Sequence, residues 1–345
     1  MTIRKILQKS FAYNVYIYFR ERRDRNKYLE QKYGDNSKAK AKAKWACLVL
    51  GFYHRDFYRL KGEDKTLKEL RDYVTYKETS GFNGSHTTKR SSNILRDKWL
   101  SYNHFKEFYG RKVAFIEKAD LSSGIAMEKL NSLMEDGHDK RLIYKPLNKN
   151  RGIGIRLFDS SEDALSFLQG SKGGIMEQVI VQNEEMASFN PSSVNTIRIH
   201  SINYGDYIDV KWPCLRVGRK GSVVDNAGAG GIFAAIDVET GITIAACDES
   251  RNTYTVHPDS QKDLVGFQVP RWNEACELTK RIARLLPEAA MVGWDLALTD
   301  SGWILVEGNG FPLIIYQIAT GKGLRNEFDQ IIKRLDRHGS EKCFF

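Results

Sequence analysis

The chain has 345 residues, of which 41% are hydrophobic and 28% are charged. This composition excludes wholesale disorder, and the length predicts about two domains. No run of about 18 uncharged apolar residues occurs, which excludes a helix that spans a membrane. The first residues carry scattered Arg and Lys and no small-residue cleavage site, so we expect no secretory signal.

The net charge of +10 is concentrated at one end of the sequence. Residues 1–50 hold 13 Lys and Arg against 4 Asp and Glu, whereas the remainder holds 40 against 39. A basic segment of this kind suits an acidic partner, such as anionic lipid, nucleic acid or an anionic polysaccharide. A face that only increases solubility is an equally good interpretation.

The chain has five cysteines, Cys47, Cys214, Cys247, Cys276 and Cys343. Their number is odd, their spacing is wide, and no CxxC motif occurs. The pattern therefore predicts neither a disulfide framework nor a zinc site, and it fits a reducing cytoplasm. We expect buried structural thiols rather than a nucleophile.

Residues 1–60 are expected to be helical. Phe11, Val15, Tyr18 and Phe19 fall on one face of a helix that continues into an Arg-rich segment. Such a helix can lie on a membrane surface, but packing of the aromatic stripe into the core is favoured. The polar segment 63–94, with its run GFNGSHTTKRSSN, predicts a mobile loop, and we place a domain boundary near residue 95.

Beyond residue 95, short β-rich runs alternate with helices, which predicts an α+β fold. The expected strands are 141–145, 153–158, 174–181, 195–203 and 207–217, and the expected helices are 162–168, 272–286 and 324–337. Segments 291–298 and 302–307 are expected to form a hairpin. Several common catalytic motifs are absent, including the P-loop, HExxH and GxSxG. His200, within a predicted strand, is expected to be a hydrogen-bonded core residue.

Three oxygen donors lie near one another in the C-terminal part of the sequence. They are Asp295 in VGWDLAL, and Glu307 and Asn309 in ILVEGNGFP. If these segments are adjacent antiparallel strands, Asp295 and Glu307 approach each other, and Asn309 points to the same side as Glu307. Such donors suit Mg²⁺, although two solvated acids at strand ends would have the same sequence pattern. Two carboxylates at this place would repel each other unless a cation lies between them.

Three basic or mixed segments suit anionic ligands. Lys145 leads into the Gly-containing loop 148–154 (NKNRGIG), which can form a phosphate cradle, and Glu177 interrupts an apolar strand that can face a purine. Arg198 and Arg216 lie on predicted strands, where a planar guanidinium suits a carboxylate or phosphate. Each signal is weak alone, and an internal ion pair explains the arginines equally well.

In their order and spacing these segments resemble the ATP-grasp superfamily, and more narrowly its sugar-transfer-associated branch, which occurs among bacterial surface-polysaccharide genes. The resemblance covers roughly residues 95–320. The segments that match the family are 97–99 (DKW), 144–146 (YKP) with the Gly loop, 176–178 (MEQ), 190–198 (NPSSVNTIR), 224–226 (VDN) with Gly230 and Gly231, 293–295 (GWD) and 307–309 (EGN).

The resemblance implies an α+β ATP-grasp fold in which two lobes clasp ATP. The ATP-grasp domain would span 96–345, with a nucleotide-covering lobe at about 115–180, after a basic helical region at 1–95. The resemblance also implies the following site roles. Lys98 and Lys145 would contact the nucleotide, and Gly152 and Gly154 would cover its triphosphate. Glu177 and the backbone of Val179 would bind adenine, and Glu184 would hold the ribose. Mg²⁺ would be bound by Asp295, Glu307 and Asn309, and the γ-phosphate or the acceptor carboxylate would be held by Arg198 and Arg216.

The sequence departs from the family pattern in two places. Many members have an Arg two positions before the metal-binding Asp, where this chain has Gly293, so another residue must supply that charge. The loop also carries Lys149 and Arg151 where Ser or Gly is common.

The resemblance implies an ATP- and Mg²⁺-dependent carboxylate–amine ligase that acts through an acyl phosphate. Its substrates would be a carboxylate and an amine, for example a carboxylated sugar and an amino acid in surface polysaccharide biosynthesis. Lys98, Arg198 and Arg216 would stabilise phosphoryl transfer. The alternatives are a kinase that phosphorylates a sugar hydroxyl, with Asp225 as base, and a non-catalytic glycan- or lipid-binding module. We expect a cytoplasmic location, with the inner face of an anionic membrane as a further site, and no nucleic-acid partner.

Overall fold

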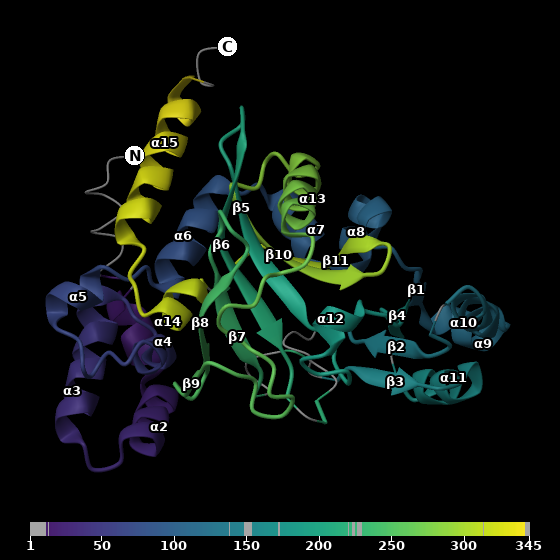
Figure 1. The fold of residues 1–345 in the computed structure, drawn as a ribbon, viewed down its shortest axis with the longest axis horizontal. Helices are drawn as coiled ribbons and strands as arrows, with labels where there is room; N and C mark the ends of the chain where they lie inside the picture. Colours follow the sequence, from purple (N-terminus) through teal and green to yellow (C-terminus); the bar gives the residue numbers. More distant parts are fainter. Residues whose placement is uncertain are drawn as a thin grey trace.

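The computed structural model describes residues 12, 14–137, 139–147, 154–171, 173–219, 221, 222, 225, 230–312 and 314–341. A helical region comes first and two antiparallel sheets follow it (Figure 1). The helices of this region are α2 (Arg22–Tyr33), α3 (Ser37–Trp45), a π-helix (Ala46–Leu50), α4 (His54–Arg59), α5 (Leu67–Arg71), α6 (Tyr76–His86), α7 (Lys89–Arg96), α8 (Lys98–Phe105) and a 3₁₀ turn (Lys106–Phe108). The predicted α+β class is confirmed.

The prediction of a mobile loop at 63–94 is wrong, because α5, α6 and most of α7 occupy it. Thr75 caps α6 through the amide of Glu78, whose carboxylate in turn accepts from the Thr75 amide. Thr88 caps α7 in a similar way through the amide of Ser91. These caps satisfy amides that would otherwise lack partners at the helix starts, and Phe82 anchors α6 in the core. The Gly and Ser content of the segment therefore misled the prediction.

The smaller sheet has the strand order β1–β4–β2–β3. Its strands are β1 (Val113–Ile116), β2 (Leu142–Lys145), β3 (Arg156–Phe158) and β4 (Gly174–Gln178). Helices α9 (Lys118–Ser123), α10 (Ile125–Glu135) and α11 (Ser161–Gln169) pack on it (Figure 1). Ser160 caps α11, the helix expected at 162–168, by accepting a hydrogen bond from the amide of Asp163.

The larger sheet has the order β11–β10–β5–β6–β7–β8–β9. Its strands are β5 (Thr196–Asn203), β6 (Ile208–Val217), β7 (Ile232–Ile236), β8 (Thr243–Asp248), β9 (Thr253–Tyr254), β10 (Met291–Thr299) and β11 (Gly302–Asn309). The expected hairpin at 291–307 is confirmed, since Thr299 pairs with Gly302 across its turn. The short helix α12 (Glu184–Ala187) precedes β5.

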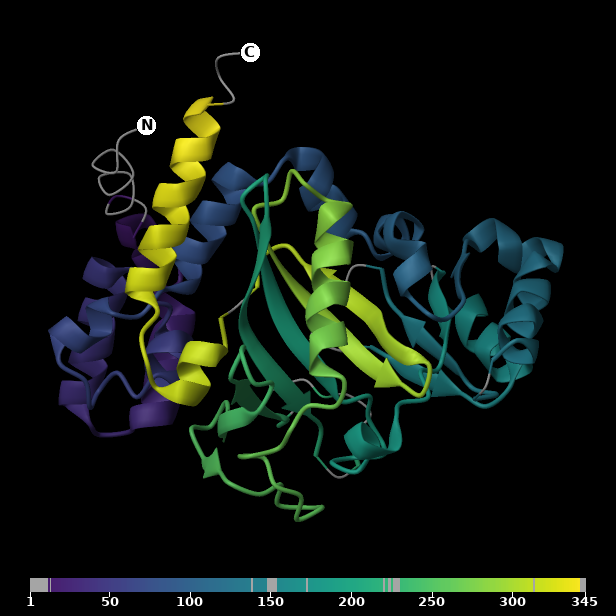
Figure 2. The same ribbon diagram turned by 45° about the horizontal axis from the view of Figure 1, so that its top comes forward.

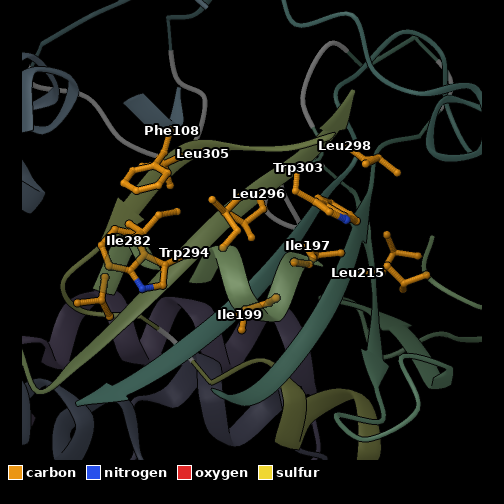
Figure 3. Close-up of a cluster of buried hydrophobic side chains, with 14 of the residues drawn as sticks. Phe108, Ile197, Ile199, Leu215, Ile282, Trp294, Leu296, Leu298, Trp303 and Leu305 are labelled. Carbon is orange, nitrogen blue, oxygen red and sulfur yellow. The ribbon is translucent and has the colours of Figure 1, made fainter. Parts of the chain in front are cut away.

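Helices cover both faces of the larger sheet. Helix α13 (Trp272–Arg284) packs on one face, and Ile197, Ile199, Trp294 and Leu296 belong to the core that it covers (Figure 3). The other face packs against the N-terminal helices and against α14 (Tyr316–Thr320) and α15 (Arg325–Glu341) (Figure 2). Because side chains alternate along a strand, the residues between those core positions, such as Arg198 and Asp295, point to the second face.

The aromatic stripe and His200 differ from the expectations. Phe19 is 62% exposed, so the favoured interpretation that it packs into the core is wrong, while Phe11 lies outside the described residues. His200 is buried as expected, but in the described part of the chain neither ring nitrogen has a hydrogen-bond partner. Burial lowers the pKa of His200 to about 3, so the ring is neutral at pH 7.

The expectation for the cysteines is met in the described part of the chain. Cys47, Cys214 and Cys247 are buried free thiols, and Cys276 is half-buried. Burial raises the pKa of Cys47 and of Cys247 to about 12, which disfavours the reactive thiolate. Cys343 lies outside the described residues.

Gln317 joins the N-terminal helices to the C-terminal part of the chain. Its side chain on α14 donates to the carbonyl of Val74 at 2.6 Å and accepts from the Val74 amide at 3.1 Å. Both residues are buried. We predict that Gln317→Leu lowers the free energy of unfolding in urea by about 2–4 kcal/mol, because two buried backbone groups lose their partners.

The matched control is Gln31→Leu on the exposed face of α2, which should change stability by less than about 0.5 kcal/mol. Equal unfolding free energies for the two variants would show that the α14 contact does not hold the helical region in place.

Candidate functional site

The three predicted oxygen donors lie at one end of the β10–β11 hairpin. Asp295 pairs directly with Glu307 across the hairpin, and Gly293 pairs with Asn309. The pairing register shifts between Asp295 and Leu296, so the strand is irregular where the acids meet. The Asn309 Nδ2 donates to Glu307 Oε1 at 3.3 Å. Asp295 is buried, whereas Glu307 is exposed and Asn309 is half-buried.

Two arginines hold the buried carboxylate of Asp295. Arg198 donates from Nε to Oδ1 and from Nη2 to Oδ2, both at 2.5 Å, and Arg216 donates from Nη1 to Oδ2 at 2.7 Å. Burial alone would raise the pKa of Asp295, but the two guanidiniums outweigh it and lower the pKa to about 2. The cation that the two acids were expected to need is thus supplied by the protein itself.

Packing against Pro312 accounts for the glycine at position 293. A Cβ built on Gly293 would lie 2.7 Å from Cβ of Pro312 and 3.4 Å from Cδ of Arg198. The structure therefore has no room for a side chain at this position. The guanidinium beside Asp295 comes instead from the neighbouring strand β5, where Arg198 pairs with Asp295.

Arg216 has a second acidic partner in Asp225. Its Nη2 lies 3.1 Å from Oδ1 of Asp225, and the Thr196 hydroxyl donates to the other oxygen of this carboxylate. Burial raises the pKa of Asp225, and the charge of Arg216 opposes that effect. Arg216 therefore bridges the two carboxylates of Asp225 and Asp295.

A second set of charges lies in the smaller sheet around Glu177. This buried carboxylate on β4 accepts from Lys145 Nζ on β2 at 2.8 Å and from Arg111 Nε at 2.9 Å. Burial would raise the pKa of Glu177, but Arg111 and Lys145 lower it to about 2. Glu177 is consequently ionised at neutral pH and holds Lys145 in place.

Arg111 was missed by the sequence analysis. Its Nη1 donates to the carbonyl of Tyr109 at 3.0 Å and to the carbonyl of Leu305 on β11 at 2.8 Å, and the side chain is almost fully buried. It thus joins the smaller sheet to the hairpin that carries Glu307. Nothing in the local run YGRKVAF marks this role, because its partners are 66 and 194 residues away.

Lys98 lies between the two sets of charges. Asp97 caps α8 through the amides of Trp99 and Leu100, which places Lys98 at the first helical position. The Lys98 Nζ donates to the carbonyl of Pro146 at 3.2 Å. Burial lowers the pKa of Lys98, and the charge of Glu307 is the strongest influence in the opposite direction.

Charges from both sets influence the pKa of Glu307. Burial and the neighbouring Asp295 raise its pKa, while Arg198, Lys145 and Arg216 act in the opposite direction. Although it lies among many protein atoms, the Glu307 side chain keeps its access to solvent. A group in this position can take up an external cation.

The remaining predicted residues lie on other segments of the chain. Val179 follows the end of β4, and Glu184 is an exposed residue that opens α12. Gly154 is exposed and has a φ of 83°, a left-handed conformation that favours glycine. Gly152 lies outside the described residues.

The donor set fits a divalent cation only if a ligand completes it. In the described part of the chain, no three His, Cys, Asp or Glu side chains are grouped closely enough to hold a metal ion. The oxygens of Glu307 and Asn309 are available, but both oxygens of Asp295 already accept hydrogen bonds from arginine. Mg²⁺ typically uses one or two carboxylates together with substrate phosphates and water, and this set meets that requirement.

Solved structures with similar folds are known. The chain matches D-alanine–D-alanine ligase from Coxiella burnetii at 13% identity, over 74% of this chain and 62% of that one, with a TM-score of 0.46. It matches the VanG D-Ala:D-Ser ligase from Enterococcus faecalis at 14% identity, over 72% and 64% of the two chains, with a TM-score of 0.48. Each match spans less than two thirds of the ligase chain.

A third match is the ATP-grasp ligase PsnB in complex with a minimal precursor, Mg and ADP, at 10% identity over 76% and 67% of the two chains, with a TM-score of 0.45. No curated protein matches this sequence. The family model of sugar-transfer associated ATP-grasp proteins matches residues 164–333, a range that contains Glu177, Arg198, Arg216, Asp295 and Glu307. Over residues 164–333, this chain is therefore similar to sugar-transfer associated ATP-grasp proteins.

Proposed function

We propose that the chain is an ATP- and Mg²⁺-dependent ligase that joins a carboxylate to an amine. The observation that carries this proposal is the arrangement at the end of the hairpin. There the accessible donors Glu307 and Asn309 lie beside Asp295, and the charges of Lys98 and Lys145 act on the same region. A triphosphate with a bound divalent cation fits this arrangement, because its phosphates suit the lysines and its cation suits the oxygen donors.

The lysines are proposed to bind the nucleotide phosphates. Lys145 is held by Glu177, and Lys98 is held by the carbonyl of Pro146, so neither side chain has to be ordered when a ligand arrives. Such preorganisation lowers the entropy cost of binding. By resemblance to the family, Gly152 and Gly154 would cover the phosphates, Glu177 and the backbone of Val179 would face the adenine, and Glu184 would hold the ribose.

Glu307 and Asn309 are proposed as ligands of Mg²⁺, which when bound would neutralise charge on the phosphates. Asp295 would join them only if one of its arginine hydrogen bonds gives way, because both of its oxygens are occupied. In the present arrangement Asp295 is better placed to orient Arg198 and Arg216. These two guanidiniums would hold the γ-phosphate or the acceptor carboxylate and stabilise the negative charge that develops during transfer.

The proposed reaction needs no nucleophile from the protein. The carboxylate of the substrate would attack the γ-phosphate to give an acyl phosphate, and the amine would then displace the phosphate. A carboxylated sugar of a surface polysaccharide and an amino acid or similar amine are the proposed substrates. The sugar-transfer association of the family supports the choice of a sugar.

Product analysis separates this proposal from a kinase on the same fold. The ligase releases ADP and free phosphate, whereas a kinase releases ADP and a phosphorylated acceptor. In a kinase Asp225 would be the base, and its raised pKa suits that role, but its carboxylate already accepts from Thr196 and Arg216. ATP turnover with a panel of amino acids and uronic-acid sugars is the assay. A phosphorylated sugar among the products would refute the ligase.

One prediction for this site concerns Glu307. We expect MgATP to raise the thermal midpoint of the parent chain and Glu307→Gln to abolish the rise, because the amide cannot supply the charge that binds Mg²⁺. Glu307 is preferred to Asp295 here, because an Asp295 variant would also remove the carboxylate partner of Arg198 and one of the two carboxylate partners of Arg216. The control is Glu128→Gln on exposed α10, which should keep the full rise. An undiminished rise in Glu307→Gln would remove this residue from the metal site.

A further prediction for this site concerns Lys145. Lys145→Ala should weaken ATP binding in calorimetry by about tenfold or more, since a charge-assisted contact to phosphate contributes about 1.5–3 kcal/mol. Lys112→Ala is the matched control, because Lys112 is exposed and pairs with Asp136 at the surface. Equal affinities in the two variants would place the nucleotide elsewhere.

The basic N-terminal region is proposed to bring the chain to the inner face of an anionic membrane. None of the described helices is both long enough and apolar enough to cross a bilayer. Tyr16 and Phe19 are exposed on the helical segment before α2, next to basic residues such as Arg20 and Arg23. Exposed aromatic and basic side chains together suit an interfacial position.

This proposal predicts sedimentation with phosphatidylserine vesicles at low salt and its loss at high salt. Replacing Tyr16 and Phe19 by Ser should reduce the sedimentation at low salt, whereas replacing the exposed Leu67 by Ser should not. If the parent chain stays in the supernatant at low salt, the basic region has another role.

A further inference from the structure

A recess lies among the N-terminal helices and shares no residue with the site described above. It is formed by the helical segment at 14–20, by α2, by the end of the π-helix and by the first residues of α4 and α6. Arg25 and Lys77 are the two cations in its lining. These two side chains carry the inference.

In the described part of the chain, Arg25 is a buried cation without an acidic partner. Its side chain is on α2, only 3% of the residue is exposed, and the guanidinium carbon lies 3.6 Å from the ring centre of Tyr18. Nη1 donates to the carbonyl of Tyr18, but the buried Nε has no acceptor in the described part of the chain. A buried charged donor is normally satisfied, so this atom points to an acceptor that comes from outside.

No nearby carboxylate replaces that acceptor. Among the described residues, none lies within ion-pair distance of Arg25, and residues 1–11 and 13, which precede the recess in the sequence, include no Asp or Glu. The carboxylate of Glu21, which also lines the recess, accepts from Arg20 at 3.0 Å. With Arg25 and Lys77 against Glu21, the charged side chains among the described residues of the lining sum to one positive charge.

Lys77 adds a second positive charge. It extends from α6 into the recess, where its ammonium group donates to Oδ1 of Asn14. Burial lowers the pKa of Lys77 to about 8, and the charge of Glu78 acts in the opposite direction. The Glu78 carboxylate is itself held by Thr75 and Arg325, each at 2.8 Å.

The backbone is shaped to form the recess. The π-helix, a rare conformation that is frequent at functional sites, ends at Gly51, which has a φ of 75°. A Cβ at Gly51 would lie 3.0 Å from Oδ1 of Asn14, the atom that accepts from Lys77. Glycine thus leaves space for the polar side chain that positions the lysine.

We propose that this recess binds a phosphate group through Arg25 and Lys77. A phosphate monoester carries nearly two negative charges at neutral pH, which matches two cations better than a carboxylate does. The planar guanidinium suits the oxygens of a tetrahedral anion, and the ammonium adds a point charge. The phosphate monoester can belong to a small soluble compound or to the head group of phosphatidic acid, and both offer the same chemistry to the recess.

The test is calorimetry with inorganic phosphate at constant ionic strength. The parent chain should bind phosphate, and both Lys77→Gln and Arg25→Lys should weaken binding about tenfold or more, because each loses a charge-assisted hydrogen bond. Lys77→Arg should keep most of the affinity. Lys68→Gln, at an exposed position on α5, is the matched control for a general loss of positive charge and should bind like the parent chain.

Phosphate can also contact the proposed nucleotide site, so Lys145→Ala is titrated in parallel and should keep the binding that Lys77→Gln loses. Equal phosphate affinity in the parent chain and in Lys77→Gln would overturn the proposal, as would the absence of binding to both phosphate and phosphatidic acid vesicles. If Lys77→Gln sediments less than the parent chain with phosphatidic acid vesicles, and equally with phosphatidylcholine vesicles, the phosphate belongs to a lipid. If the two chains sediment equally while calorimetry shows the loss, it belongs to a soluble compound.

Discussion

The ion pairs that two arginines form with the buried carboxylate of Asp295 are the interactions on which the rest of the site depends. Removing one partner from a buried ion pair of this kind typically costs about 3–5 kcal/mol, because the other charge is left without compensation. Three adjacent strands, β5, β6 and β10, supply Arg198, Arg216 and Asp295. These ion pairs therefore also fix the three strands relative to one another. The two arginines also offset the charge of Asp295 and act against the rise in the pKa of the solvent-facing Glu307 beside it.

The smaller sheet repeats this arrangement with Glu177. Arg111 and Lys145 neutralise its carboxylate, and Arg111 also donates to the carbonyl of Leu305 on the hairpin. The two sheets are therefore joined by a buried charged side chain as well as by apolar packing. This link sets the position of Lys145 relative to Glu307, and that relation is what the proposed binding of a metal–nucleotide complex requires.

The sequence was most informative where function depends on neighbouring strands. The pairing of Asp295 with Glu307 followed from a hairpin whose turn could be located from Thr299 to Gly302, because side-chain alternation fixes which residues share a face. The partners of these acids could not be derived in this way. Arg111 reaches Glu177 over 66 residues, and no local pattern encodes such a distance.

The helical region was harder to predict for a related reason. The segment around Phe82 contains Gly, Asn and Ser, which favour turns, and its helices are stabilised by caps and by packing against α15 and the larger sheet. Tertiary contacts thus override local propensity there. The exposure of Phe19 shows the opposite case, in which a correct helical pattern did not reveal which face is buried.

The central claim is that the end of the β10–β11 hairpin binds a divalent cation together with a nucleotide. The most direct measurement is a crystal structure of the chain grown with ADP and Mn²⁺, with anomalous diffraction used to locate the metal. The account predicts an anomalous peak within coordination distance of Glu307 and Asn309, with the diphosphate between that peak and Lys145. A nucleotide bound elsewhere, or a metal peak away from Glu307, would contradict it.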